Sequence, residues 1–79
     1  MNIPKLIKII PVENYHLELF YDNGEHKLFD FNQYLSYNIY KVLSDINNFK
    51  NVQISLNTAT WFGNIDISPD RLYLEGENI

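Results

Sequence analysis

The sequence predicts an α+β domain, in which an antiparallel sheet of five to six strands is combined with short helices, one of them C-terminal. Three observations predict this class. Apolar and polar residues alternate in several short runs, as they do in half-buried strands. A turn signal joins two of these runs, and a proline-initiated helix signal follows the last of them. With 79 residues, the chain has room for one domain, 1–79.

The first half of the chain is predicted to form three strands. Residues 5–10 are rich in β-branched side chains and lie between two prolines, which favours a strand at a sheet edge. Residues 15–21 alternate, and residues 22–24 read Asp-Asn-Gly, a strong hairpin signal. A two-residue turn and a three-residue loop both fit this signal. Only the three-residue loop puts Leu17 and Phe29 on one face, so it is the favoured register.

The second half of the chain is predicted to form shorter helices and strands. Residues 32–37 and 40–49 read as short helical pieces, with Ser44 or Asp45 as the cap of the second. The period then returns to two: residues 52–56 and 59–62 are predicted strands around a turn at 57–58, and residues 65–67 are a last extended piece.

The last helix has a clear start signal. Ser68 is a suitable cap, Pro69 suits the first helical position, and Asp70 complements the positive N-terminal end. We expect this helix to turn Leu72, Tyr73 and Leu74 inward before it ends at residues 75–76.

Composition excludes several classes of site. The chain has no cysteine, so disulfides, thiolate nucleophiles and cysteine-ligated metals are excluded. Ten acidic and six basic residues give a net charge of −4, and the lysines are scattered, which disfavours nucleic acid and anionic membranes as partners. No apolar run is long enough to span a bilayer, and the N-terminus does not resemble a signal peptide. We therefore expect a cytoplasmic protein that needs no cofactor.

Two pairs of polar residues invite a catalytic interpretation. In the favoured register His16 faces Asp30, as a general base faces its orienting carboxylate, but no nucleophile is indicated nearby. His26 lies several residues along the same face, which is a poor arrangement for zinc. Asp66 and Asp70 flank the last helix start, where turn and helix-end hydrogen bonding explains both. The sequence therefore predicts no catalytic, metal or cofactor residue, and no enzyme.

The adjacent aromatic residues Trp61 and Phe62 are the best indication of a working surface. Neighbouring strand residues point to opposite faces, so both cannot enter one core. One of them is expected to stay exposed, and exposed aromatics are typical of interaction hot spots. We take Trp61, Phe62, Asp66 and Tyr73 as the candidate interaction surface.

The order of elements resembles the bacterial domain-of-unknown-function family numbered 2442. The resemblance spans residues 7–73 and includes the Asp-Asn-Gly turn, Phe29-Asp30-Phe31 and Val42-Leu43-Ser44-Asp45. Its most specific part runs from Trp61 through Asp66-Ile67-Ser68-Pro69 to Leu72-Tyr73. Family members commonly carry proline and glycine where this chain has Phe62 and Asn64, which puts the local turn geometry in question.

The resemblance implies a small α+β fold, no established enzymatic activity, and genes arranged in pairs similar to toxin–antitoxin pairs. Some relatives carry a helix-turn-helix domain after this one, which the present chain is too short to include. Our first hypothesis is a protein-interaction module that binds another small protein, such as an antitoxin-like member of a two-gene pair. The second is a regulatory or sensory domain beside a DNA-binding protein, and the third is a small hydrolase using His16 and Asp30. The predicted edge strand at residues 6–10 also offers a place for a second copy to pair.

Overall fold

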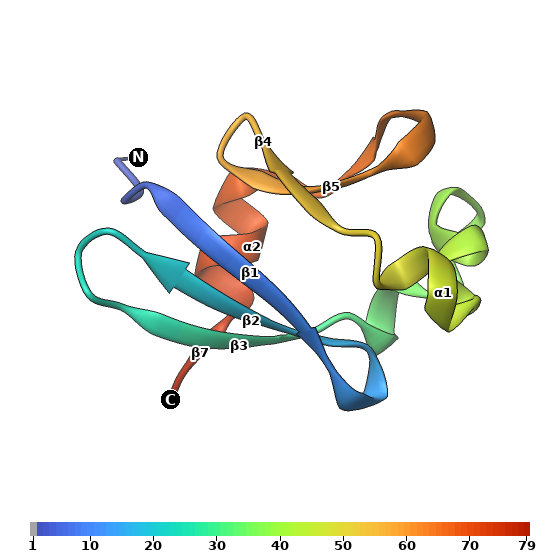
Figure 1. Ribbon diagram of the computed structural model, residues 1–79, viewed down its shortest axis with the longest axis horizontal. Coiled ribbons are helices and arrows are strands. Elements are labelled where there is room, and N and C mark those ends of the chain that lie inside the picture. Colours follow the sequence, from blue (N-terminus) through green and yellow to red (C-terminus); the bar gives the residue numbers. More distant parts are fainter. Residues whose placement is uncertain (1) are drawn as a thin grey trace.

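A computed structural model describes residues 2–79 (Figure 1). None of the helices in this range is both long and apolar enough to cross a membrane. The strands are β1 (Leu6–Val12), β2 (His16–Tyr21), β3 (His26–Asp30), β4 (Gln53–Ser55), β5 (Thr58–Trp61), β6 (Ile65–Asp66) and β7 (Glu77–Asn78). The α-helices are α1 (Ile46–Phe49) and α2 (Pro69–Glu75). The 3-10 helices are η1 (Glu13–Tyr15), η2 (Asn32–Tyr34), η3 (Asn38–Ser44) and η4 (Phe62–Asn64).

The α+β class is confirmed, but the prediction of one sheet is wrong. The strands form a four-stranded sheet in the order β1-β2-β3-β7 and a three-stranded sheet in the order β4-β5-β6, with every pair antiparallel. The two sheets approach each other where β1 begins, but there a side chain joins them in place of a backbone ladder. Asn57 accepts from the Leu6 N–H at 2.7 Å and donates to the Pro4 carbonyl at 3.1 Å.

The β2–β3 hairpin has the favoured three-residue register. Leu17 pairs with Phe29, and the Tyr21 N–H donates to the Glu25 carbonyl at 3.0 Å to close the loop. Gly24 has a φ of 90°, in the left-handed region that glycine adopts without cost. The hydrophobic pattern therefore selected the loop length.

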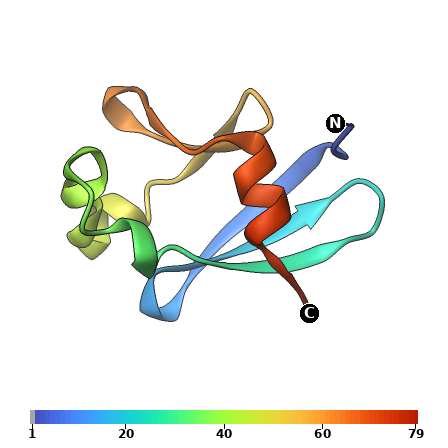
Figure 2. The same cartoon turned by 180° about the vertical axis from the view of Figure 1, so that it is seen from behind.

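The core lies between the two sheets and α2. One face of β2 and β3 is fully buried, whereas the alternate residues keep part of their exposure. Figure 2 shows α2 packed across the back of the four-stranded sheet, and its Leu72 is completely buried. The largest completely buried side chains are Phe29, Phe31, Phe49, Leu17, Leu19, Leu43 and Leu72.

Three local expectations need correction. The β4–β5 turn is at Leu56 and Asn57, one residue earlier than predicted, and both residues have left-handed φ values of 51° and 65°. Leu74 points outward and is 61% exposed, because a seven-residue helix lying on a sheet turns only one narrow stripe inward. Ser68 occupies the N-cap position but its hydroxyl makes no capping hydrogen bond. In contrast, Asp45 caps α1 through the Asn47 N–H at 3.0 Å.

Candidate functional site

Trp61 and Phe62 take opposite environments at the end of β5. Trp61 is 3% exposed, and its indole N–H donates to the Phe49 carbonyl at 2.9 Å. Phe62 is 49% exposed. The indole has a hydrogen-bond acceptor inside the core and the phenyl ring is left outside, so Phe62 is the exposed aromatic of the pair. The predicted strand 59–62 ends one residue early, because Phe62 is the first residue of η4.

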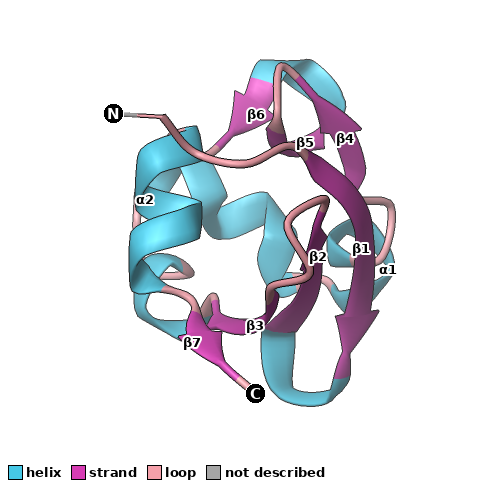
Figure 3. Ribbon diagram, turned by 90° about the vertical axis from the view of Figure 1, so that its left-hand side faces the viewer, coloured by secondary structure: helices cyan, strands magenta, loops and turns pink. Residues whose placement is uncertain are grey.

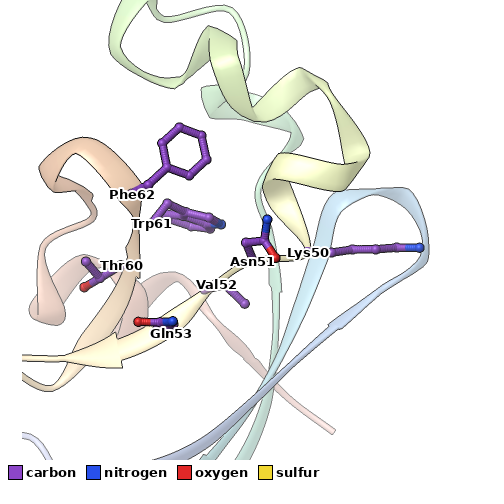
Figure 4. A pocket seen from close by; sticks show the side chains of 7 residues that line it. All are labelled: Lys50, Asn51, Val52, Gln53, Thr60, Trp61 and Phe62. Carbon is purple, nitrogen blue, oxygen red and sulfur yellow. The ribbon is translucent and has the colours of Figure 1, made fainter.

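A hollow of about 510 Å³ opens beside these two aromatics, where the chain entering β4 diverges from β5. Figure 4 shows Trp61 and Phe62 on one side of it and Val52 on the other, while the Lys50 side chain points away. Asn51, Gln53, Thr60 and Lys50 complete the lining. The hollow therefore has an aromatic wall and polar groups at its rim, and the Lys50 side chain extends away from it.

The 3-10 helix η3 adds a second apolar element near Phe62. Its repeat of three residues per turn places Ile39 and Val42 above one another, and they are 59% and 41% exposed. The Tyr40 hydroxyl donates to the Asp66 carbonyl at 2.7 Å, which ties η3 to β6. In Figure 4 the Phe62 ring points toward η3. We refer to Ile39, Val42 and Phe62, with Tyr37 at 53% exposure, as the η3–η4 patch.

The four residues predicted as an interaction surface do not gather in one place. Phe62 belongs to the patch, and Trp61 forms the wall beneath it. Asp66 lies opposite Thr60 in β6 with its side chain exposed. Tyr73 lies on α2, where its ring packs edge-on against Tyr21 at 5.1 Å. Tyr73 thus belongs to the contact between α2 and the four-stranded sheet. We did not predict that Ile39 and Val42 are exposed, although their spacing of three residues in the sequence is the repeat of a 3-10 helix.

A buried lysine, Lys27, holds the end of α2 on the sheet, and it lies on the same face of β3 as Phe29. Lys27 is 6% exposed, its amine lies 4.4 Å from the Tyr73 ring centre, and it donates to the Gly76 carbonyl at 3.3 Å. The Glu25 carboxylate is 3.9 Å away and accepts a hydrogen bond from the Tyr73 hydroxyl. Aromatic, carboxylate and carbonyl groups together compensate the buried cation.

Burial and these neighbours shift the titration of the same cluster. Desolvation, and after it the nearby Tyr73 and Glu25, together raise the pKa of Tyr21 to about 12. Hydrogen bonds from Asn23 and then from Tyr73 hold the pKa of Glu25 below its ordinary value. The Tyr21 hydroxyl has no hydrogen-bond partner in the described chain.

The histidines lie on the opposite, outer face of the four-stranded sheet. His16 Nε2 is 3.8 Å from the exposed carboxylate of Asp30. Hydrogen bonds from the Asn32 backbone and side chain hold the pKa of Asp30 below its ordinary value. His26 stacks on Phe20 with ring centres 4.3 Å apart. Within residues 2–79, no three histidine or carboxylate side chains gather closely enough to hold a metal ion.

Comparison with known families places the chain. The sequence model of the family described as protein of unknown function DUF2442 matches residues 6–78. The chain belongs to this family. The DUF2442 match begins at the first residue of β1 and ends at the last residue of β7, so it takes in both sheets and the two-residue strand that was not predicted. No curated protein and no solved structure matches the chain.

Proposed function

We propose that this DUF2442 protein is a non-catalytic protein-interaction module that binds another small protein through the η3–η4 patch. The exposure of Phe62 beside a hollow with an aromatic wall carries the proposal. Half of a large aromatic surface faces solvent although the chain has a core of its own to fill. Exposed apolar groups that lie together, rather than singly, mark interaction surfaces.

The patch has the anatomy of an interface centre. Completely burying a large apolar side chain contributes about 1.5–3 kcal/mol, so three half-exposed residues supply a small hot spot. The hollow beside Phe62 gives a partner side chain a place to enter, and Asn51 and Gln53 supply hydrogen-bonding groups at its rim. Aromatic, aliphatic and amide groups in this arrangement suit a protein surface better than a small charged ligand.

The gene arrangement that the family resemblance implies, in pairs similar to toxin–antitoxin pairs, supports the product of an adjacent gene as the partner. In that arrangement the domain acts as the antitoxin-like member, which neutralises its partner by covering part of it. Binding without chemistry is consistent with the loose surface pair of His16 and Asp30, whose nitrogen and oxygen are 3.8 Å apart.

The test is co-expression of the tagged protein with each adjacent gene product, followed by copurification and measurement of the stoichiometry. We expect a stable complex that Phe62→Ser weakens by about tenfold or more, which corresponds to the loss of one hot-spot residue. Leu74→Ser is the matched control, because Leu74 is 61% exposed on α2 and outside the patch. Equal loss in both variants, or no complex with any adjacent product, would contradict the proposal.

A further inference from the structure

The outer face of the four-stranded sheet is a second surface without a covering element. Along β2 the buried residues alternate with half-exposed ones, and β3 follows the same pattern. In Figure 3 α2 lies on the inner side of this sheet. The half-exposed residues include four apolar side chains that lie on the outer face across three strands: Ile10, Val12, Phe20 and Leu28.

Two hollows meet on this face. One, of about 550 Å³, has a mainly apolar lining and is bounded by Val12, His16 and Leu28. The other, of about 280 Å³, shares His16 and Leu28 but is otherwise lined by polar groups, among them Asp30 and Glu77. An apolar depression therefore adjoins an acidic one, with Leu28 between them.

Half of the protein's net charge lies on and around this face. Five of the ten carboxylates stand there, opposed by three cations. These are Lys8, Lys50, which lines a hollow with Val12 and Glu13, and Arg71, which is 3.5 Å from Glu75. Five carboxylates against three cations leave −2 of the total −4. The five carboxylates are Glu13 and Glu18, then Asp30, Glu75 and Glu77.

We propose that the outer face of the four-stranded sheet is a second binding surface, which takes a basic amphipathic segment of a partner protein. The apolar side chains of such a segment would cover Val12 and Leu28, and its lysines or arginines would meet Glu18, Asp30 and Glu77. An acidic field around an apolar strip steers a basic partner toward the face and fixes its orientation.

The same charge argues against two other occupants. A second copy of this chain would bring its own five carboxylates against the face, and like charges brought together are destabilising. Nucleic acid carries phosphates and would be repelled in the same way. A basic protein segment is the occupant whose charge and apolar content both match.

The binding test uses two synthetic peptides, one alternating leucine with lysine and one alternating leucine with glutamate, titrated into the full chain by calorimetry. We expect the basic peptide to bind and the acidic one not to bind. Amide chemical shifts should change at Ile10, Glu18 and Leu28. The affinity should fall as salt is added, because exposed charge pairs are screened.

Two triple variants locate the interaction. Glu18→Gln, Asp30→Asn and Glu77→Gln together should weaken binding by about tenfold or more, as expected for several rim charges. Asp45→Asn, Asp66→Asn and Asp70→Asn together make the same change in net charge elsewhere and should leave the affinity within about twofold. Asn at position 45 still caps α1.

Several outcomes would overturn the inference: no binding of the basic peptide, equal binding of the acidic peptide, equal loss in both triple variants, or shifts confined to the η3–η4 patch. Phe62→Ser should leave peptide binding unchanged, so the outer face and the proposed function at the patch fail or succeed separately.

Discussion

The indole N–H of Trp61 donates a 2.9 Å hydrogen bond to the carbonyl of Phe49, so the last residue of β5 closes the end of α1. Both rings are buried and lie 5.9 Å apart. This contact joins the three-stranded sheet to the helical segment that separates the two sheets. Trp61 is therefore part of the core, whereas the neighbouring Phe62 is exposed to solvent.

Trp61→Phe should destabilise the protein by about 2–4 kcal/mol. The smaller ring leaves a cavity and removes the indole N–H that donates to the Phe49 carbonyl, and the two losses add to each other. Urea unfolding measures the change. Phe62→Leu serves as the control and should stay within about 0.5 kcal/mol, as is usual for surface substitutions. A larger effect at Phe62 than at Trp61 would mean that the two residues have been assigned to the wrong environments.

Leu56→Asn should stabilise the protein by about 1 kcal/mol. Leu56 is 88% exposed and has a φ of 51°, so it contributes little burial and pays the left-handed penalty, which costs a side chain with Cβ about 1–2 kcal/mol. Asparagine is preferred at this place in a two-residue hairpin turn. Thermal or urea unfolding of the variant gives the answer, and a loss of stability would show that Leu56 makes a contact of its own in folding.

Asn57→Leu is the opposite case in the same turn and should cost about 2–3 kcal/mol. Asn57 also has a left-handed φ, and its amide joins the two sheets through Leu6 and Pro4. Leucine loses both hydrogen bonds and brings the backbone penalty. If amide exchange at Leu6 were no faster in this variant, the side-chain bridge would not be what holds the start of β1.

Local pattern predicted much of this fold because the decisive interactions are local in sequence. The register of β2 with β3 followed from alternation and one glycine, and the start of α2 followed from Pro69. The division into two sheets could not be predicted in this way, because it depends on contacts such as Asn57 with Leu6, which are 51 residues apart. The same limit applies to Lys27, whose burial depends on a helix far along the chain.

The candidate surface was predictable only in part, for a related reason. Strand alternation required that Trp61 or Phe62 be exposed, but the Phe49 carbonyl that selects the indole comes from another element. Tyr73 was predicted to share this surface with Phe62. The structure places it instead against Tyr21 and Lys27.

Gly76→Ala should destabilise the end of α2 by about 1–3 kcal/mol. A Cβ on Gly76 would lie 3.1 Å from the Leu72 carbonyl oxygen and 3.3 Å from two carbons of Lys27, all packed tightly. The backbone at Gly76 is extended, with a φ of −68°, so the substitution is limited by space and not by conformation. This crowding destabilises the folded state by more than alanine stabilises the protein through the lower conformational entropy of its unfolded chain. Urea unfolding measures it, and a neutral or stabilised variant would show that the Lys27 stem can move aside.

Tyr21→Phe should leave stability at neutral pH unchanged or raised by up to about 1 kcal/mol, since the buried hydroxyl that it removes has no hydrogen-bond partner within residues 2–79. It should also change how the free energy of unfolding depends on pH in the alkaline range. The pKa of Tyr21 is raised from 10.0 to about 12 in the folded protein. A raised pKa contributes stability that is complete below the unfolded value and is lost as the pH rises toward the folded value. Wild-type stability should therefore fall between pH 10 and 12, and Tyr21→Phe should flatten part of that fall.

Tyr34, whose pKa is also raised to about 12, supplies the comparison. Urea midpoints across this range for the wild type, Tyr21→Phe and Tyr34→Phe measure each share, and an unchanged alkaline slope in Tyr21→Phe would show that this phenol does not resist ionisation in the folded state.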